Sequence, residues 1–337
     1  MTINVLICDD SAMARKQMAR ALPEHWDIEL HYAADGKECL ERLRAGEGEL
    51  LFLDLNMPVL DGYQVLEAIA AEDLGALVIV VSGDIQPEAR ARVLKMGALD
   101  FIRKPTDPAV VRELLIKFGL FRDDQAQDTP EDTTLPETSP ENLSMLDCLQ
   151  ELSNVAMGRA GDLLARLLHV FVKMPIPKVN TLEASELRMA LSVAENNNTY
   201  SAVCQGFIGA GLSGEALLLF SDTSFDDMAK LLRYEPEEEN GMEVELLMDM
   251  SSILAGAFLK GLSDQMDIPF GMGHPSVLGQ HIQIGDLLEQ KSDHWRKMLS
   301  IEINYAIEGH NIDCDLLLLF TEDSIPALEE KLHYLMD

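Results

Sequence analysis

Over the first 121 residues, five apolar runs alternate with five helical patterns, and this alternation constrains the fold more than any other feature. The runs are NVLICDD, DIELHYAA, LLFLDLNMP, ALVIVVSG and DFIRKP. Stretches such as SAMARKQMARAL, which lie between and after them, repeat apolar residues at helical spacing. Strands that alternate with helices pair in parallel, because each helix returns the chain to the same edge of the sheet. We therefore predict an α/β domain with a doubly wound, five-stranded parallel sheet over residues 1–121.

Polar and charged side chains stand where four of these strands end. Asp9 and Asp10 follow the first strand, Asp54 the third, Ser82 the fourth and Lys104 the fifth. In a parallel sheet these ends meet at one edge, where ligands bind. Three carboxylates repel one another there, Mg²⁺ relieves the repulsion, and a lysine suits a phosphoryl oxygen. One such aspartate could be a solvated loop residue, but the ordered set predicts a carboxylate that attacks a phosphoryl donor and becomes an acyl phosphate.

The motifs CDDS, LDLNMPVLDG, VVSGD and FIRKP resemble the receiver domain of bacterial response regulators, the CheY-like family. The resemblance extends from residue 3 to about 120. It implies that Asp54 is the phosphoacceptor and that Ser82 and Lys104 contact the phosphoryl group. It also implies that Asp9, Asp10, Asp54 and the backbone carbonyl of Asn56 hold Mg²⁺. Phe101 stands where the family has a switch aromatic, although plain packing against the fifth strand explains it equally well.

Composition limits the partners and the location of the chain. The 337 residues carry a formal net charge of -32, which repels nucleic acid and anionic lipid, so we expect neither as a partner. No apolar run reaches the roughly 18 to 20 residues that cross a bilayer, and the first residues lack the basic region of a signal peptide. The five cysteines are scattered and form no metal-binding spacing. We therefore expect a cytoplasmic protein without membrane insertion.

A linker is predicted at residues 122–143. The stretch RDDQAQDTPEDTTLPETSPENL contains three prolines and many acids but almost nothing apolar, so it cannot bury enough surface to order itself. A flexible chain of this length has an end-to-end distance of roughly 25 Å. Two domains, 1–121 and 144–337, are therefore expected on either side of it.

An internal repeat occupies residues 144–337. LLLFSDTSFDDMAKLL, which begins at Leu217, matches LLLFTEDSIPALEEKL from Leu317, and both predict a buried strand followed by an amphipathic helix. ELSNVAMGRAGDLL, which begins at Glu151, matches DMSSILAGAFLKGL from Asp249. The repeat predicts an α+β domain with halves at about 144–240 and 241–337, related by a pseudo-twofold axis.

The opening helix of this domain is predicted to begin at Ser144, where Asp147 completes a capping box, and to end before Pro175. At 100° per residue, one face should form the core: Leu149, Leu152, Ala156, Leu163, Leu167 and Phe171. The opposite stripe should face outward: Asp147, Glu151, Asn154, Gly158 and Asp162.

Glycine recurs within the repeated helices. Gly158 corresponds to Gly256, although glycine in a helix interior costs roughly 1 kcal/mol relative to alanine. We predict that another backbone approaches closely at this position, either from this domain or from a docked partner. Glu151 corresponds to Asp249, and Asn154 corresponds to Ser252. An ordinary solvated helix face remains an alternative for Glu151 and Asn154 taken alone.

The ELSN motif, the following Pro177, the two-copy layout and endings such as GEALLLFSD resemble the CheC/CheX family of phosphatases, which act on phosphorylated CheY. The resemblance covers about Leu143 to Leu335. It implies that Asn154 positions a water and that Glu151 docks onto the lysine of the target receiver. In the second copy, Asp249 is shorter than glutamate and Ser252 has no amide, so we expect that degenerate site to be weak or silent.

The combined prediction is a two-component response regulator. A histidine kinase would phosphorylate Asp54, and the second domain would hydrolyse aspartyl phosphate on a separate CheY-like receiver or on Asp54 itself. The alternative is a non-enzymatic module whose docking is gated by phosphorylation in chemotaxis-type signalling. A metal-dependent hydrolase is less favoured, because the repeat shows no cluster of histidine and aspartate ligands.

Overall fold

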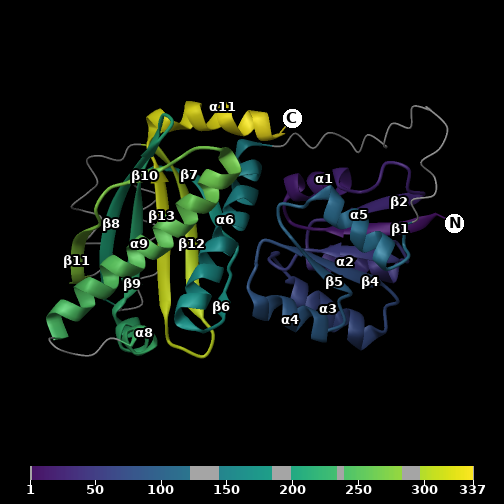
Figure 1. Cartoon of the computed structure of the whole chain (residues 1–337), viewed down its shortest axis with the longest axis horizontal. Coiled ribbons are helices and arrows are strands. Elements are labelled where there is room, and N and C mark those ends of the chain that lie inside the picture. Colours follow the sequence, from purple (N-terminus) through teal and green to yellow (C-terminus); the bar gives the residue numbers. More distant parts are fainter. Residues whose placement is uncertain (1, 122–143, 184–198, 234–238, 283–296, 337) are drawn as a thin grey trace. The chain divides into compact units, whose positions relative to one another are not determined.

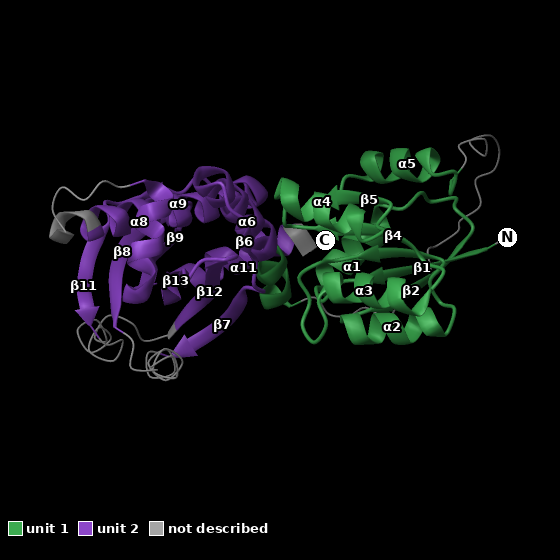
Figure 2. Ribbon diagram, turned by 90° about the horizontal axis from the view of Figure 1, so that it is seen from below, with its two compact units in different colours: residues 1–151 green, residues 152–337 purple. Residues whose placement is uncertain are grey.

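The computed structural model describes the chain at residues 2–121, 144–183, 199–233, 239–282 and 297–336. It divides into two compact units, Met1–Glu151 and Leu152–Asp337 (Figure 2). The predicted linker, residues 122–143, lies outside the described residues. The domain limits at 121 and 144 therefore stay predictions.

The sheet of unit 1 has five parallel strands, as the alternation predicted (Figure 1). Their order is β2-β1-β3-β4-β5, so the direction of strand addition reverses between β1 and β3. In such sheets the crevice for ligands opens at this switch point, beyond the carboxyl ends of the strands. The strands are β1 (Ile3–Cys8), β2 (Ile28–Ala33), β3 (Leu50–Leu53), β4 (Leu77–Ser82) and β5 (Asp100–Arg103).

Helices cover both faces of this sheet. Alternate residues of each strand point to opposite faces, so Leu6 packs with α2, α3 and α4, whereas Ile7 packs with α1 and α5. Side-chain caps fix several helix starts: Ser11 accepts from the amide of Ala14, and Asp61 forms a capping box with Gln64. The helices are α1 (Ala12–Arg20), α2 (Gly36–Arg44), α3 (Gly62–Glu72), α4 (Pro87–Lys95) and α5 (Pro108–Lys117).

Unit 2 is built on an eight-stranded antiparallel sheet of order β10-β8-β9-β13-β12-β6, to which β7 and β11 add by pairing with β12 and β8. Elements of the first half are α6 (Met145–Leu168), whose start belongs to unit 1, β6 (Val172–Lys173), β7 (Lys178–Glu183), β8 (Tyr200–Gly209), β9 (Leu212–Ser221), the 3₁₀ helix η2 (Asp222–Ser224) and α8 (Phe225–Leu232). Elements of the second half are α9 (Glu239–Met266), β10 (Gly271–Met272), β11 (Ser276–Ile282), β12 (Lys297–Ile307), β13 (Asp313–Phe320), η3 (Glu322–Ser324) and α11 (Ile325–Met336).

The strand order has the symmetry that the sequence repeat predicts. Exchanging the two halves leaves the order unchanged, and β9 pairs with β13 at the centre, where Leu217 faces its repeat equivalent Leu317. Two equivalent serines bind the opposite half in the same way. Ser224 bonds the backbone of Asp313, and Ser324 bonds the backbone of Ser213, each through both N–H and C=O. The predicted pseudo-twofold α+β architecture is confirmed.

Helix α6 begins as predicted but packs differently. Ser144 and Asp147 form the reciprocal capping bonds. Leu163 and Leu167, predicted to be core, are 48% and 46% exposed. The prediction assumed one buried face, whereas every residue from 151 to 158 is buried. The stripe predicted to face outward is therefore wrong for Glu151, Asn154, Gly158 and Asp162, all of which are buried.

Among the described residues, no other backbone approaches Gly256 closely, whereas one does approach Gly261. Around Gly256, the nearest atom to an added Cβ would be the Met272 sulfur at 3.8 Å, an ordinary contact. A Cβ on Gly261 would instead lie 2.7 Å from Cα of Ala156. Gln265 adds a hydrogen bond from its Nε2 to the carbonyl of Leu152 at 3.0 Å. Helices α6 and α9 therefore meet at Ala156 and Gly261.

One part of α9, Glu243–Met266, is long and apolar enough by length and composition to cross a membrane, contrary to the expectation from the sequence. The same test is passed by core helices of globular domains. Within unit 2, Leu254, Phe258 and Leu262 of this helix are fully buried. Its apolar character is therefore explained by packing inside unit 2.

Candidate functional site

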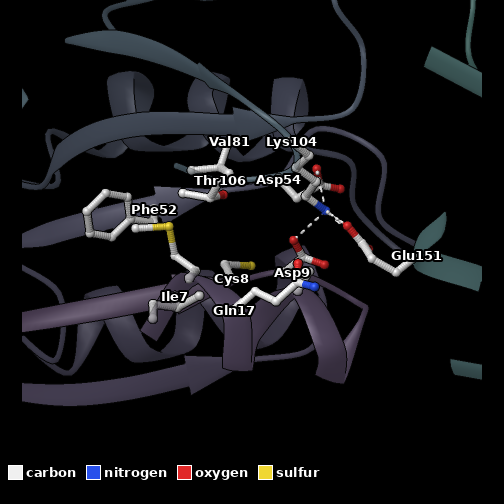
Figure 3. A pocket seen from close by; sticks show the side chains of 12 residues that line it. Ile7, Cys8, Asp9, Gln17, Phe52, Asp54, Val81, Lys104, Thr106 and Glu151 are labelled. Carbon is white, nitrogen blue, oxygen red and sulfur yellow. Dashed lines mark hydrogen bonds and ion pairs between the residues drawn. The ribbon is translucent and has the colours of Figure 1, made fainter. Parts of the chain in front are cut away.

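The carboxyl ends of three strands in unit 1 bring a lysine against two aspartates. Asp9 follows β1, Asp54 follows β3 and Lys104 follows β5, and all three are buried. Nζ of Lys104 lies 2.7 Å from Oδ2 of Asp9 and 3.4 Å from Oδ1 of Asp54 (Figure 3). The predicted convergence is present, because these strands are parallel and end at one edge of the sheet.

Asp10 completes an acidic cluster with Asp9 and Asp54. One carboxylate oxygen from each residue lies within 4.8 Å of the others. Oδ1 of Asp10 is buried and has no hydrogen-bond partner among the described residues. Burial, followed by the charge of Asp54, raises the pKa of Asp10 to about 7. A buried oxygen without a partner among clustered carboxylates fits a hard divalent cation such as Mg²⁺.

Backbone amides orient two of these carboxylates. The amide of Ser11 donates to Oδ1 of Asp9 at 3.0 Å, and the amide of Asn56 donates to Oδ2 of Asp54 at 2.9 Å. Each aspartate therefore has one oxygen held by its own loop and the other turned to Lys104. The part predicted for the backbone carbonyl of Asn56 stays a prediction.

The charge of Lys104 is strongly favoured at this position. Burial alone would lower its pKa, but the carboxylates of Asp54, Asp9 and Glu151 outweigh burial and hold the pKa well above its usual range. Burial raises the pKa of Asp9, and Lys104 opposes that effect. The buried ammonium thus neutralises carboxylates that would otherwise repel one another.

Ser82 and Phe101 lie beside this cluster on β4 and β5. Ser82 is fully buried, and its Oγ accepts a hydrogen bond from the amide of Asp84 at 3.1 Å. Phe101 is 9% exposed and packs in the core between the sheet and α2, α3 and α4. Packing thus accounts for the position of Phe101, and its switch role stays a prediction.

Glu151 and Asn154 lie one turn apart on α6. Within unit 1, Oε1 of Glu151 lies 3.3 Å from Nζ of Lys104. The glutamate lines a small pocket together with Lys104 and the two aspartates that Lys104 contacts (Figure 3). In unit 2, Asn154 is 4% exposed, and neither its Oδ1 nor its Nδ2 has a partner among the described residues. Buried amides are normally hydrogen-bonded, so an unpaired one calls for a functional explanation. In contrast, Asp249 and Ser252 of the second copy are exposed on α9.

A polar cluster in unit 2 escaped the sequence analysis. Nδ1 of His281 lies 2.9 Å from Oδ2 of Asp222, and its Nε2 lies 3.1 Å from Oε2 of Glu243. Ser201 donates its hydroxyl to Asp222 at 2.9 Å. This pairing of a histidine with two acids was not identified from the sequence. No spacing could indicate it, because the residues come from β8, η2, α9 and β11.

This cluster does not form a nucleophile–base pair. The hydroxyl of Ser201 donates to a carboxylate and, among the described residues, accepts from the backbone amide of His281 at 3.3 Å. A catalytic serine instead bonds an imidazole nitrogen of its base. The two ring nitrogens of His281 both face carboxylates, so the cluster is an ion-pair network that ties β11 to α9.

Comparisons with known proteins support the receiver resemblance. Residues 5–116 match the family described as the response regulator receiver domain. Protein-glutamate methylesterase/protein-glutamine glutaminase 3 of Geobacter sulfurreducens is 36% identical over 121 residues, which are 36% of this chain and 32% of that protein. The chain spans about a third of the length of this relative. The N-terminal part is thus a CheY-like receiver domain.

Two solved structures are also similar to parts of the chain. Thermotoga maritima FliY is 17% identical, with a TM-score of 0.43, and the match covers 60% of this chain and 99% of that chain. A chain of the CheX-CheY-BeF3-Mg complex from Borrelia burgdorferi is 32% identical, with a TM-score of 0.32, over 35% of this chain and 89% of that chain. The CheC/CheX resemblance of residues 144–337 stays a prediction, since the curated relative carries a methylesterase name.

Proposed function

We propose that this chain is a cytoplasmic two-component response regulator whose α6 helix catalyses hydrolysis of aspartyl phosphate. A histidine kinase phosphorylates Asp54. Residues 144–337 then remove the phosphoryl group from a CheY-like receiver, which is either a separate protein or the chain's own first domain. The buried amide of Asn154, whose two polar atoms have no partner among the described residues, is the observation that carries the phosphatase part of the proposal.

Phosphorylation uses the acidic cluster of unit 1. An oxygen of Asp54 attacks the phosphorus of phosphohistidine; the new O–P bond forms while the N–P bond to the donor breaks. Asp9, Asp10 and Asp54 would hold Mg²⁺, which would neutralise charge on the phosphoryl oxygens when bound. Lys104 already lies 3.4 Å from Asp54, so its ammonium is positioned to bind a phosphoryl oxygen on that residue.

Hydrolysis needs a water aligned with the bond to be broken. The water attacks phosphorus, the bond from phosphorus to the aspartate oxygen breaks, and phosphate leaves as the carboxylate is regenerated. A side-chain amide can hold this water, because it both donates and accepts without titrating. Asn154 has its donor and its acceptor unused among the described residues. Burying an amide without hydrogen-bond partners costs desolvation free energy. A polar ligand such as an attacking water would supply the missing hydrogen bonds.

Glu151 supports the same assignment. Its carboxylate lies 3.3 Å from Nζ of the lysine of a receiver, here Lys104. A glutamate that binds the lysine of a target receiver would orient the helix that also carries Asn154. The helix rises about 1.5 Å per residue, so the amide follows the carboxylate by roughly 4.5 Å.

We do not propose for this chain the methylesterase activity that appears in the name of its relative. The match covers 121 residues and 32% of that protein, and the Ser201, Asp222 and His281 cluster lacks the geometry of a nucleophile. The non-enzymatic docking module is the rival outcome of the experiment below.

The test measures phosphate release from a separate phosphorylated CheY-like receiver. The added chain carries Asp54→Asn, so that its own acceptor cannot contribute. We expect this chain to accelerate release, and we expect Asn154→Ala to lower the acceleration by about 100-fold, as loss of a positioned reactant does. Ser252→Ala, at the equivalent exposed position, is the matched control and should act like the parent.

Glu151→Gln separates docking from catalysis. Because it removes the charge that binds lysine, we expect it to raise the receiver concentration needed for half-maximal release more than it lowers the maximal rate. Absence of acceleration by the parent chain with any CheY-like receiver, together with phosphorylation-dependent binding, would establish the docking module instead.

A further inference from the structure

We propose that Arg15 is a positioning residue that holds the β1–α1 loop in the conformation needed for divalent-cation binding. This inference rests on the proposed Mg²⁺ site of unit 1. Arg15 lies near the start of α1 and reaches back toward the loop that carries Asp9 and Asp10. Its hydrogen bonds to the backbone carbonyls of Asp9 and Asp10 are the contacts through which it would act on the site.

The hydrogen bonds of Arg15 bracket the loop. Nη1 of the guanidinium donates to the carbonyl of Asp9 at 2.8 Å and to the carbonyl of Asp10 at 3.3 Å. Both bonds end on backbone oxygens, so they fix the peptide units and leave the carboxylates available. A charged donor makes stronger bonds than a neutral one, so this clamp resists displacement by water.

The clamp matters most for Asp10. The side chain of Asp9 is oriented by the amide of Ser11 and by Lys104. Oδ1 of Asp10 has no partner among the described residues, so the local backbone decides where that oxygen points. Carboxylates that face one another repel, and a loosely held loop would relieve the repulsion by turning Asp10 away. Arg15 opposes that movement.

A positioning role and a simple electrostatic role of Arg15 predict opposite effects of its removal on Mg²⁺ affinity. Removing a positive charge from the neighbourhood of a cation site should strengthen Mg²⁺ binding, because like charges repel. Removing a clamp should weaken binding, because outer groups that orient metal ligands are typically worth 10- to 100-fold in affinity. The sign of the change therefore identifies the role of Arg15.

The experiment is Mg²⁺ titration of the full chain by isothermal calorimetry, with parallel thermal unfolding in EDTA. The variants are Arg15→Ala and Arg15→Lys, and the latter keeps the charge without the planar guanidinium. Lys16→Ala, which removes an exposed cation from the next position of α1, is the charge control. We expect about tenfold weaker Mg²⁺ binding for both Arg15 variants and a change below about twofold for Lys16→Ala.

Unchanged or tighter Mg²⁺ binding by Arg15→Lys and Arg15→Ala overturns the inference while leaving the metal site intact. A lower melting temperature in EDTA with unchanged Mg²⁺ affinity also overturns it, since that result shows a purely structural role. Failure of the wild-type chain to bind Mg²⁺ overturns the metal site itself, and the inference with it. If Arg15→Ala does not fold, the affinity of Arg15→Lys decides the question.

Discussion

Lys104 is the residue on which the acidic site of unit 1 most depends. Its ammonium pairs with Asp9 and Asp54, whose side chains are 6% and 3% exposed. Removing one partner of a buried ion pair is costly, because it leaves charge uncompensated in a poorly solvated site. Mg²⁺ at the same carboxylates would supply part of the missing charge.

Lys104→Met should therefore destabilise the chain in a metal-dependent way. We expect the free energy of unfolding to fall by about 3 kcal/mol in EDTA and by clearly less in saturating Mg²⁺. Urea denaturation followed by circular dichroism measures both values, and Lys37→Met, at an exposed position of α2, should change neither by more than about 0.5 kcal/mol. An equal loss with and without Mg²⁺ would contradict the proposed site.

At this scale the sequence predicts the receiver site well and the α6 site poorly. Chain order places Asp9, Asp54 and Lys104 at strand ends, and parallel pairing then brings them together without further information. The orientation of Glu151 and Asn154 was predicted from one helix alone. A helical wheel does not show how many elements pack around a helix. The prediction that both residues are exposed was therefore wrong.

At the scale of elements, His281 links the strand β11 to η2 and α9. The residue adopts a φ of 54° in the left-handed region, and its ring bonds Asp222 and faces Glu243. The hydrogen bond to Asp222 raises the pKa of His281, partly against burial, and Glu243 adds to the effect. The bond pattern thus favours the protonated ring in the folded state.

A pH dependence of stability follows from this raised pKa. Stabilisation by His281 should be complete below its unfolded pKa of about 6.5 and should disappear as pH rises through the higher folded pKa. His281→Asn is a suitable variant, because asparagine tolerates a positive φ. We expect its melting temperature to fall furthest below wild type at pH values below about 6.5 and to approach wild type as pH rises through the raised pKa of folded His281. A difference that stays constant or grows with pH would contradict this assignment.

Element types were predictable from the sequence where periodicity was clear. The sequence correctly predicted the five strands of unit 1 and the strand–helix endings of both repeats. In each case an apolar run marks the strand, and apolar residues at helical spacing mark the helix that follows. The contact between α6 and α9 at Gly261 was not predicted from the sequence. Gly158 and Gly256 stood out because they recur, whereas Gly261 has no counterpart at the matching position of the first copy and gave no repeat signal.

At the scale of the whole molecule, the two halves of the repeat complete one another. β6 and β7 of the first half pair with β12 of the second, and β10 and β11 pair with β8 of the first. Each half therefore leaves its short strands unpaired when the other is absent. Offset matching revealed the repeat, but a sequence offset cannot show that strands are exchanged between halves.

Neither half should fold as a monomer. Residues 144–240 expressed alone would lack the central partner β13 and the edge partner β12. We expect this fragment to be unfolded or to form a symmetric dimer, whereas 144–337 should fold as a monomer. Sedimentation equilibrium with amide hydrogen exchange distinguishes these cases. A protected, monomeric 144–240 fragment would refute the mutual dependence of the halves.

The central claim is that the amide of Asn154 accelerates hydrolysis of aspartyl phosphate. The most direct measurement follows, on one phosphate-affinity gel, the decay of phosphorylated Asp54 in the full chain and of an added phosphorylated CheY-like receiver. Wild type and Asn154→Ala are compared after the phosphodonor is removed. The account predicts that the variant prolongs the lifetime of at least one of the two species by about 100-fold. Identical lifetimes of both species in wild type and variant would contradict it.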